Sequence, residues 1–71
     1  MPVEIRAHSS GVVFHIAAKP GEQVAAGDPV VVLKSMMVEI SVEAPRAGAV
    51  RAITVRVGQA VQEGDPVAVL D

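Results

Sequence analysis

Residues 11–33, GVVFHIAAKPGEQVAAGDPVVVL, and residues 48–70, GAVRAITVRVGQAVQEGDPVAVL, are two copies of one pattern, and this repeat decides the fold. Shifted by 37 positions, the copies align without a gap and are identical at eleven of 23 positions. The same offset places residues 3–5 on residues 40–42. Two copies are too few for a solenoid. The repeat therefore predicts two similar halves that bury their apolar faces against each other around a pseudo-twofold axis.

Both copies carry the same turn signals. Gly21 and Gly58 occupy positions where a strand must turn, and glycine adopts positive φ there without steric cost. The tetrapeptide GDPV occurs at 27–30 and again at 64–67. Gly-Asp favours a turn, and the proline presets φ where the next strand begins. These signals divide each half into about four short strands.

The segments between the turns are rich in valine and predict an all-β protein. No segment keeps a 3.6-residue apolar period over three turns, so we expect no helix of consequence. In 29–34 and 66–70, the alternation predicts that positions 30, 32, 67 and 69 face the core and that Val31 and Ala68 are less buried. The expected strands are residues 2–7, 11–18, 22–25, 29–34, 39–44, 48–55, 59–62 and 66–70.

Residues 35–38, SMMV, connect the last strand of the first half to the first strand of the second half. This connection has no counterpart within the repeat, because a shift by 37 positions in either direction moves it to the chain ends or past them. We therefore expect a hairpin that protrudes at the pole of the molecule opposite the termini.

Composition narrows the function classes. The chain has 71 residues and a net charge of −2, and Phe14 is its only aromatic residue, which argues against nucleic-acid binding. Cysteine is absent, and His8 and His15 have no convergent ligands in the sequence, so no metal site is expected. There is no catalytic constellation, signal-peptide core or apolar run of membrane-spanning length. We expect a soluble, cytoplasmic, monomeric protein that is not an enzyme by itself.

The sequence resembles the biotinyl/lipoyl attachment domain family, in particular small biotin carboxyl carrier-type proteins. The resemblance covers essentially the whole chain and rests on the repeated G…V…GD.V…L pattern, the central hairpin, and VEAPRAGAV at 42–50. It implies a single domain over 1–71, with half-repeats at about 3–34 and 40–71, folded as a flattened eight-stranded barrel-sandwich hybrid of two four-stranded antiparallel sheets. Residues 17–22 align without a gap with 54–59, so the thumb insertion of some members is not expected.

In this family the hairpin typically reads E-[AS]-M-K-M-E, and its lysine receives biotin through an amide bond. The gap-free alignment places Lys34 at the first glutamate, Ser35 at the small residue, Met36 at the first methionine, Met37 at the lysine, Val38 at the second methionine and Glu39 at the last glutamate. A thioether cannot form the amide. The resemblance therefore implies biotin for the family, but no cofactor is expected on Met37.

Other interpretations of the hairpin stay open. Lys34 is the fallback attachment residue, although it lies three residues before Met37, about 10 Å away along an extended chain, and has the opposite strand parity. Lys19, in a Pro-Gly turn, is less favoured still. The pair Met36 and Met37 either caps the end of the core, forms an apolar docking tip, or belongs to a motif whose attachment site lies elsewhere.

The resemblance implies biotin carboxylase, carboxyltransferase and biotin protein ligase as partners. Family members belong to acyl-CoA carboxylase machinery, where a mobile biotin carries CO2 between the first two sites and the domain does no chemistry. Without the lysine, a role in scaffolding, regulation or competition is expected. The alternatives are a working carrier modified on Lys34 and a structural β-domain unrelated to biotin. Glu39, Glu43 and Arg46 form either a solvated face or a partner contact.

Overall fold

The computed structural model describes all residues from 1 to 71 and contains eight strands and no helix. The strands are β1 (Val3–Arg6), β2 (Gly11–Ile16), β3 (Gln23–Val24), β4 (Pro29–Ser35), β5 (Val38–Glu43), β6 (Gly48–Ile53), β7 (Ala60–Val61) and β8 (Pro66–Leu70). The predicted all-β class is confirmed, although several strands are shorter than expected. No helical segment could cross a membrane.

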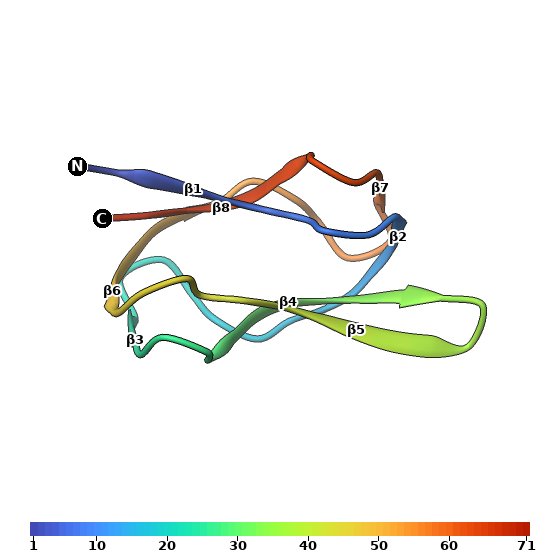
Figure 1. Ribbon diagram of the computed structural model, residues 1–71, viewed down its shortest axis with the longest axis horizontal. Helices are drawn as coiled ribbons and strands as arrows, with labels where there is room; N and C mark the ends of the chain where they lie inside the picture. Colours follow the sequence, from blue (N-terminus) through green and yellow to red (C-terminus); the bar gives the residue numbers. More distant parts are fainter.

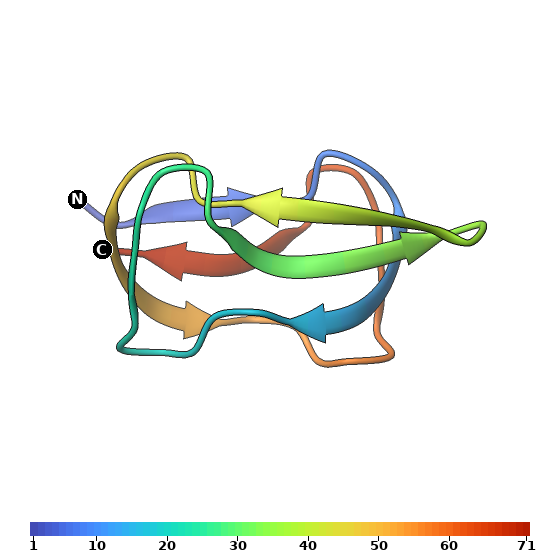
Figure 2. The ribbon, with the colours of Figure 1, turned by 90° about the horizontal axis from the view of Figure 1, so that it is seen from below.

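The strands form two four-stranded antiparallel sheets, ordered β1-β8-β6-β3 and β5-β4-β2-β7 (Figures 1 and 2). The repeat makes β1, β2, β3 and β4 equivalent to β5, β6, β7 and β8, in that order. If each strand is replaced by its equivalent, the order of one sheet becomes the order of the other. Each sheet takes two strands from each half, so the halves interlock instead of forming one sheet apiece. This arrangement agrees with the predicted barrel-sandwich of two sheets.

The turns of each half are fixed to strands of the other half. The Gly21 amide donates to the carbonyl of Val50, and the Gly58 amide donates to the carbonyl of Val13, both at 2.7 Å. Gly21 and Gly58 have φ values of 89° and 93°, which confirms the predicted turns at these positions. Residues 17–22 and 54–59 contain no additional strand or helix, so there is no thumb.

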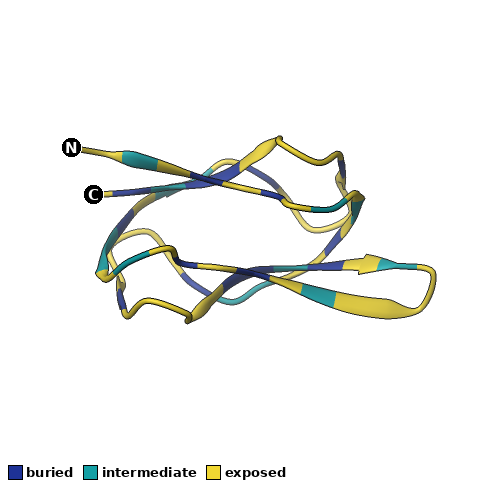
Figure 3. Cartoon of the chain, in the orientation of Figure 1, coloured by how far each residue is buried: buried dark blue, intermediate teal, exposed yellow.

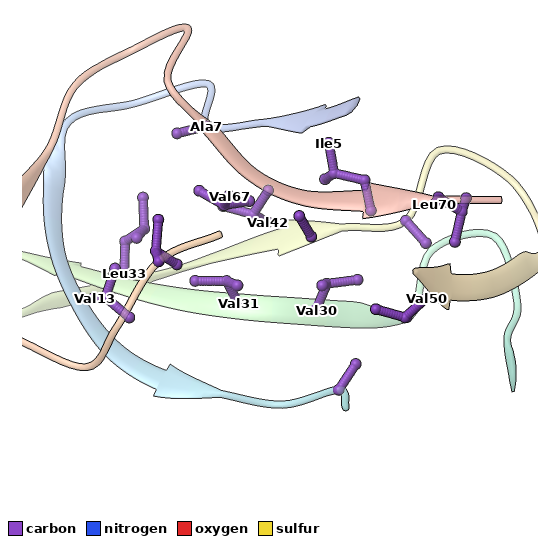
Figure 4. Packing of buried hydrophobic residues seen from close by; sticks show 14 of the residues in the cluster. Ile5, Ala7, Val13, Val30, Val31, Leu33, Val42, Val50, Val67 and Leu70 are labelled. Carbon is purple, nitrogen blue, oxygen red and sulfur yellow. The ribbon is translucent and has the colours of Figure 1, made fainter. Parts of the chain in front are cut away.

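The core between the sheets is built entirely from apolar side chains (Figure 4). Leu33 and Leu70 occupy equivalent positions and are both fully buried. The sixteen buried residues are Ile5, Ala7, Val13, Ala18, Val24, Val30, Val31, Leu33, Val42, Ala44, Val50, Val55, Val61, Val67, Ala68 and Leu70. The hydrophobic effect therefore supplies the main stabilisation, and no polar or charged residue is buried.

The predicted strict alternation along the last strand of each half is wrong. Val30 and Val31 are both fully buried, whereas Val32 is only partly buried. A β-bulge explains this, because β4 advances two residues, from Pro29 to Val31, where β5 advances one. The extra residue turns two successive valines toward the core. The equivalent bulge in β8 does the same at residues 66–68.

The molecule measures 33 × 17 × 17 Å, and its two ends differ. The chain termini lie at one end, and the hairpin that joins β4 and β5 projects at the other (Figure 1). The hairpin end extends further than the equivalent strands at the chain termini, because β4 has seven residues and the equivalent β8 has five. The predicted protrusion opposite the termini is confirmed.

Candidate functional site at the hairpin tip

The tip is a two-residue turn made of Met36 and Met37. Ser35 ends β4 and pairs with Val38, the first residue of β5. Met36 and Met37 have φ values of 49° and 68°, and positive φ at both central residues is the requirement of a type I′ hairpin turn. That turn favours Asn and Gly, and other L-residues lose about 1–2 kcal/mol each in this conformation. The methionines therefore occupy these positions at a cost to stability.

Both methionines are almost fully exposed. Met36 is 94% and Met37 is 90% accessible, and Val38 beside them is 59% accessible. The tip of the hairpin is coloured as exposed in Figure 3. The interpretation that Met36 and Met37 cap the end of the core is therefore wrong. The part of the hairpin that projects beyond the last buried residues, Leu33 on β4 and Val42 on β5, is called the arm and comprises residues 34–41. Met36 and Met37 lie at its tip. The tip is an apolar surface that contributes nothing to the core.

Lys34 carries the amine nearest to the turn in sequence, but its side chain lies over the neighbouring strand. Its Nζ is 4.9 Å from the centre of the Phe14 ring, a cation–π arrangement on the exposed face of β2 and β4. Such a contact contributes about 0.5–1 kcal/mol at an exposed site. Glu39 pairs with Lys34 across the strands but forms no salt bridge with it. The ammonium thus has a partner on β2, away from the turn.

The remaining site candidates do not converge. Glu39 and Glu43 are exposed on β5, while Arg46 is half-buried at the other end of the molecule. The Arg46 guanidinium donates to the main-chain oxygens of Met1 at 3.0 Å, Asp71 at 2.7 Å and Ala47 at 3.2 Å. This role of Arg46 is not predictable from the sequence, because main-chain acceptors leave no side-chain signal.

No enclosed site is present. The side chains leave no pocket, and no three His, Asp or Glu side chains come together as a metal site would need. His8, His15 and Lys19 are all exposed, each on a different segment.

The chemistry of the tip is limited by its residues. The turn itself contains two thioethers and no amine, so it cannot form an amide with a carboxyl group. Met36, Met37 and Val38 are exposed side by side at the tip, and contiguous exposed apolar groups can mark interaction sites.

Three comparisons relate the chain to known proteins. The family described as "Biotin-requiring enzyme" matches residues 1–70. A single-chain, multi-domain long-chain acyl-CoA carboxylase is 34% identical over 96% of this chain and 7% of its own length, with a TM-score of 0.88. The urea carboxylase of Kluyveromyces lactis is 31% identical over 100% of this chain and 6% of its own length, with a TM-score of 0.95. No curated protein matches the sequence.

Proposed function

The chain belongs to the family of biotin- and lipoyl-attachment domains, and on that premise we propose that it is a carboxyl carrier-like domain that docks without carrying biotin at its hairpin. It is related to domains of biotin-dependent carboxylases, of which it spans only a small fraction of the length. We propose two properties of this chain, a docking role and the absence of biotin at the hairpin.

The residue at position 37 carries the proposal. The family motif puts its lysine at the second position of the turn, and this chain has Met37 there, 90% accessible at the end of a projecting arm. Biotin attachment needs a primary amine that attacks the carbonyl carbon of biotinyl-adenylate, expels AMP and loses a proton as the amide forms. A thioether sulfur has no N–H to lose. The residues present at the turn therefore do not fit the cofactor.

The strand register supports this assignment. Pairing of β4 with β5 is regular from Ser35 and Val38 down to Val31 and Val42. A slip by one residue would move side chains such as Leu33 and Val42 from the core face to the exposed face. The turn is therefore held at Met36 and Met37 and cannot easily form again around Lys34.

A second candidate is a working carboxyl carrier modified on Lys34. The favourable observation is that Lys34 is exposed and lies on the same arm, two residues before the turn. Its position over Phe14 argues against it, because the amine would have to leave that ring to reach a ligase active site. A structural β-domain with no link to biotin is the third candidate.

The proposed partners are biotin protein ligase, biotin carboxylase and carboxyltransferase. The exposed Met36 and Met37 support recognition by these partners, because they give the hairpin an apolar contact surface. The role would be scaffolding, regulation or competition with biotin-bearing domains. The monomeric state and the cytoplasmic location remain predictions.

One experiment tests both parts of the proposal. The unaltered chain and the Met37→Lys variant are incubated together with biotin protein ligase, biotin and ATP, and each is followed by intact mass. We expect one biotinyl group on Met37→Lys, none on the unaltered chain, and slower labelling of Met37→Lys as the unaltered chain is added in excess. Met37→Ala is the matched control for labelling and should gain no biotinyl group. It should compete less well than the unaltered chain, because it loses part of the apolar contact surface.

The other candidates predict different results. Biotin on the unaltered chain that is lost in Lys34→Ala would establish the second candidate. No labelling of Met37→Lys and no competition would favour the third.

A further inference from the structure

One long sheet edge is left unpaired. β5 is the outer strand of its sheet and pairs only with β4 (Figure 2). It has six residues, whereas the other outer strands have four in β1 and two each in β3 and β7. No turn, loop or side-chain hydrogen bond involves residues 38–43. An open edge of this length is a template for another strand.

The register indicates which backbone groups are free. Ser35 and Val38 face each other across a two-residue turn, which makes them a hydrogen-bonded pair, and such pairs alternate with non-hydrogen-bonded pairs along an antiparallel ladder. The next inward residue after β5 agrees with this alternation, because the Ala44 amide donates to the carbonyl of Asp28. Glu39, Ser41 and Glu43 therefore direct their N–H and C=O groups away from β4. These three residues offer up to six hydrogen bonds to an added strand.

The same residues give this edge a charge pattern. Glu39, Ser41 and Glu43 are exposed and share one face of the sheet, since side chains two residues apart point to the same side. Neither glutamate forms an ion pair, because the two salt bridges of the molecule join Arg6 to Glu4 and Arg51 to Asp71. An added strand would meet two free carboxylates about 13 Å apart.

The charges disfavour a second copy of this chain as the occupant. Antiparallel pairing of β5 with its own copy about Ser41 would place Glu39 directly opposite the copy's Glu43, twice over. Like charges directly opposite each other destabilise a strand pair. A strand with lysine or arginine at two positions four residues apart would instead place a cation opposite each carboxylate.

We propose that the free edge of β5 is a docking surface for an extended, basic segment of a partner protein, which adds to the sheet as a strand. The backbone supplies the hydrogen bonds, and Glu39 and Glu43 select Lys or Arg at i and i+4. This inference does not depend on the chemistry at Met37, because that side chain takes no part in the edge. Met37→Lys is therefore expected to bind the segment unchanged, whatever happens to biotin.

The test uses a synthetic peptide, acetyl-Thr-Lys-Val-Thr-Val-Lys-Thr-amide, and a control peptide with both lysines replaced by glutamate. The unaltered chain is titrated with each, and amide hydrogen exchange is followed by NMR. With the basic peptide, exchange at Glu39, Ser41 and Glu43 should slow by at least about tenfold at saturation. The acidic peptide should have no such effect. No binding of the basic peptide, or equal binding of both, would overturn the proposal.

A proline at the centre of the edge separates strand addition from mere charge attraction. Ser41→Pro removes an N–H that faces away from β4, so the β4–β5 ladder should persist while peptide binding weakens at least about tenfold. Ser41→Thr is the matched control and should bind as the unaltered chain does. Full binding by a folded Ser41→Pro would contradict the proposal.

Two further arms complete the test. The double change Glu39→Gln and Glu43→Gln should weaken binding by about threefold to tenfold and reduce its salt dependence. If Ser41→Pro does not fold, a peptide N-methylated at its central threonine serves instead. Undiminished binding of that peptide to the unaltered chain would equally contradict strand addition.

Discussion

The pseudo-twofold axis relates the hairpin end of the molecule to the end that holds residues 1 and 71, and the two ends use equivalent positions differently. At the chain-end side, Arg46 donates to the main-chain oxygens of Met1 and Asp71 and ties the first and last segments together. Its equivalent at the hairpin end is Ser9, whose hydroxyl has only a 3.4 Å contact with its neighbour. The covalent turn needs no such tie. Ser9 therefore has no structural role comparable to that of Arg46.

A second equivalent pair shows the same division. Arg51 Nε lies 2.6 Å from Asp71 Oδ1, and the matching positions in the first half hold Phe14 and Lys34, with Nζ 4.9 Å from the ring. Phe14 and Arg51 both lie at a β-bulge, in β2 and β6 respectively. Their partners lie near the end of β4 and directly after β8. The chain-end pair is an ion pair, whereas the hairpin pair leaves an aromatic face and an ammonium exposed beside the arm. The two halves thus share the same backbone positions for these contacts, but the side chains at the two ends of the molecule differ.

The largest expected effects test the common framework. Leu33→Ala and Leu70→Ala remove equivalent, fully buried side chains, so each should lower the free energy of unfolding by about 2–5 kcal/mol. Urea denaturation measures both values. We expect the two values to agree within about 2 kcal/mol, which is the spread seen for this substitution at different buried sites. A larger difference between the two free energies would show that the two halves of the core are not energetically equivalent.

The next effect sharpens the contrast between the ends. Arg46→Ala should cost about 1–2 kcal/mol and speed amide exchange at Asp71, because it removes the donor to three main-chain oxygens. Ser9→Ala, the matched change at the hairpin end, should cost less than about 0.5 kcal/mol. Denaturation curves and hydrogen exchange distinguish the two. Equal costs would mean that Arg46 does not tie the chain ends.

A smaller effect, of opposite sign, is expected at the tip. Replacing Met36 by Asn and Met37 by Gly supplies the residues that a type I′ turn favours, and should raise the free energy of unfolding by about 1 kcal/mol. In a domain of this size that corresponds to a rise in Tm of about 4–8 °C. Met36→Ala with Met37→Ala is the control and should give no such gain. Destabilisation by Asn-Gly would show that the methionines support the fold.

The smallest effects concern the two exposed pairs. Double-mutant cycles to alanine should give coupling energies of about 0.5–1 kcal/mol for Phe14 with Lys34 and about 0.2–1 kcal/mol for Arg51 with Asp71. The coupling of Arg51 with Asp71 should fall at 1 M salt, because both side chains are about half exposed. Zero coupling in the first cycle would show that Phe14 does not hold the Lys34 side chain, and it would strengthen the case for modification of Lys34.

The all-β class and the turns at Gly21 and Gly58 are predictable because they depend on local residue chemistry. The projecting hairpin is predictable because residues 35–38 have no counterpart within the repeat. The burial of Val31 and Ala68 was not predictable, since a bulge is a property of two paired strands. The positive φ of Met36 and Met37 was equally hidden, because methionine carries no turn signal. The role of Arg46 was missed for a similar reason, since its acceptors are backbone oxygens far away in sequence.

The central claim is that the fold presents Met37 where the family presents an amine. The most direct measurement is the intact mass of the unaltered chain and of Met37→Lys after separate, identical reactions with biotin protein ligase. The account predicts no change for the unaltered chain and a gain of one biotinyl group, located at position 37 by fragmentation, for the variant. A biotinyl group on the unaltered chain, or none on a folded Met37→Lys, would contradict it.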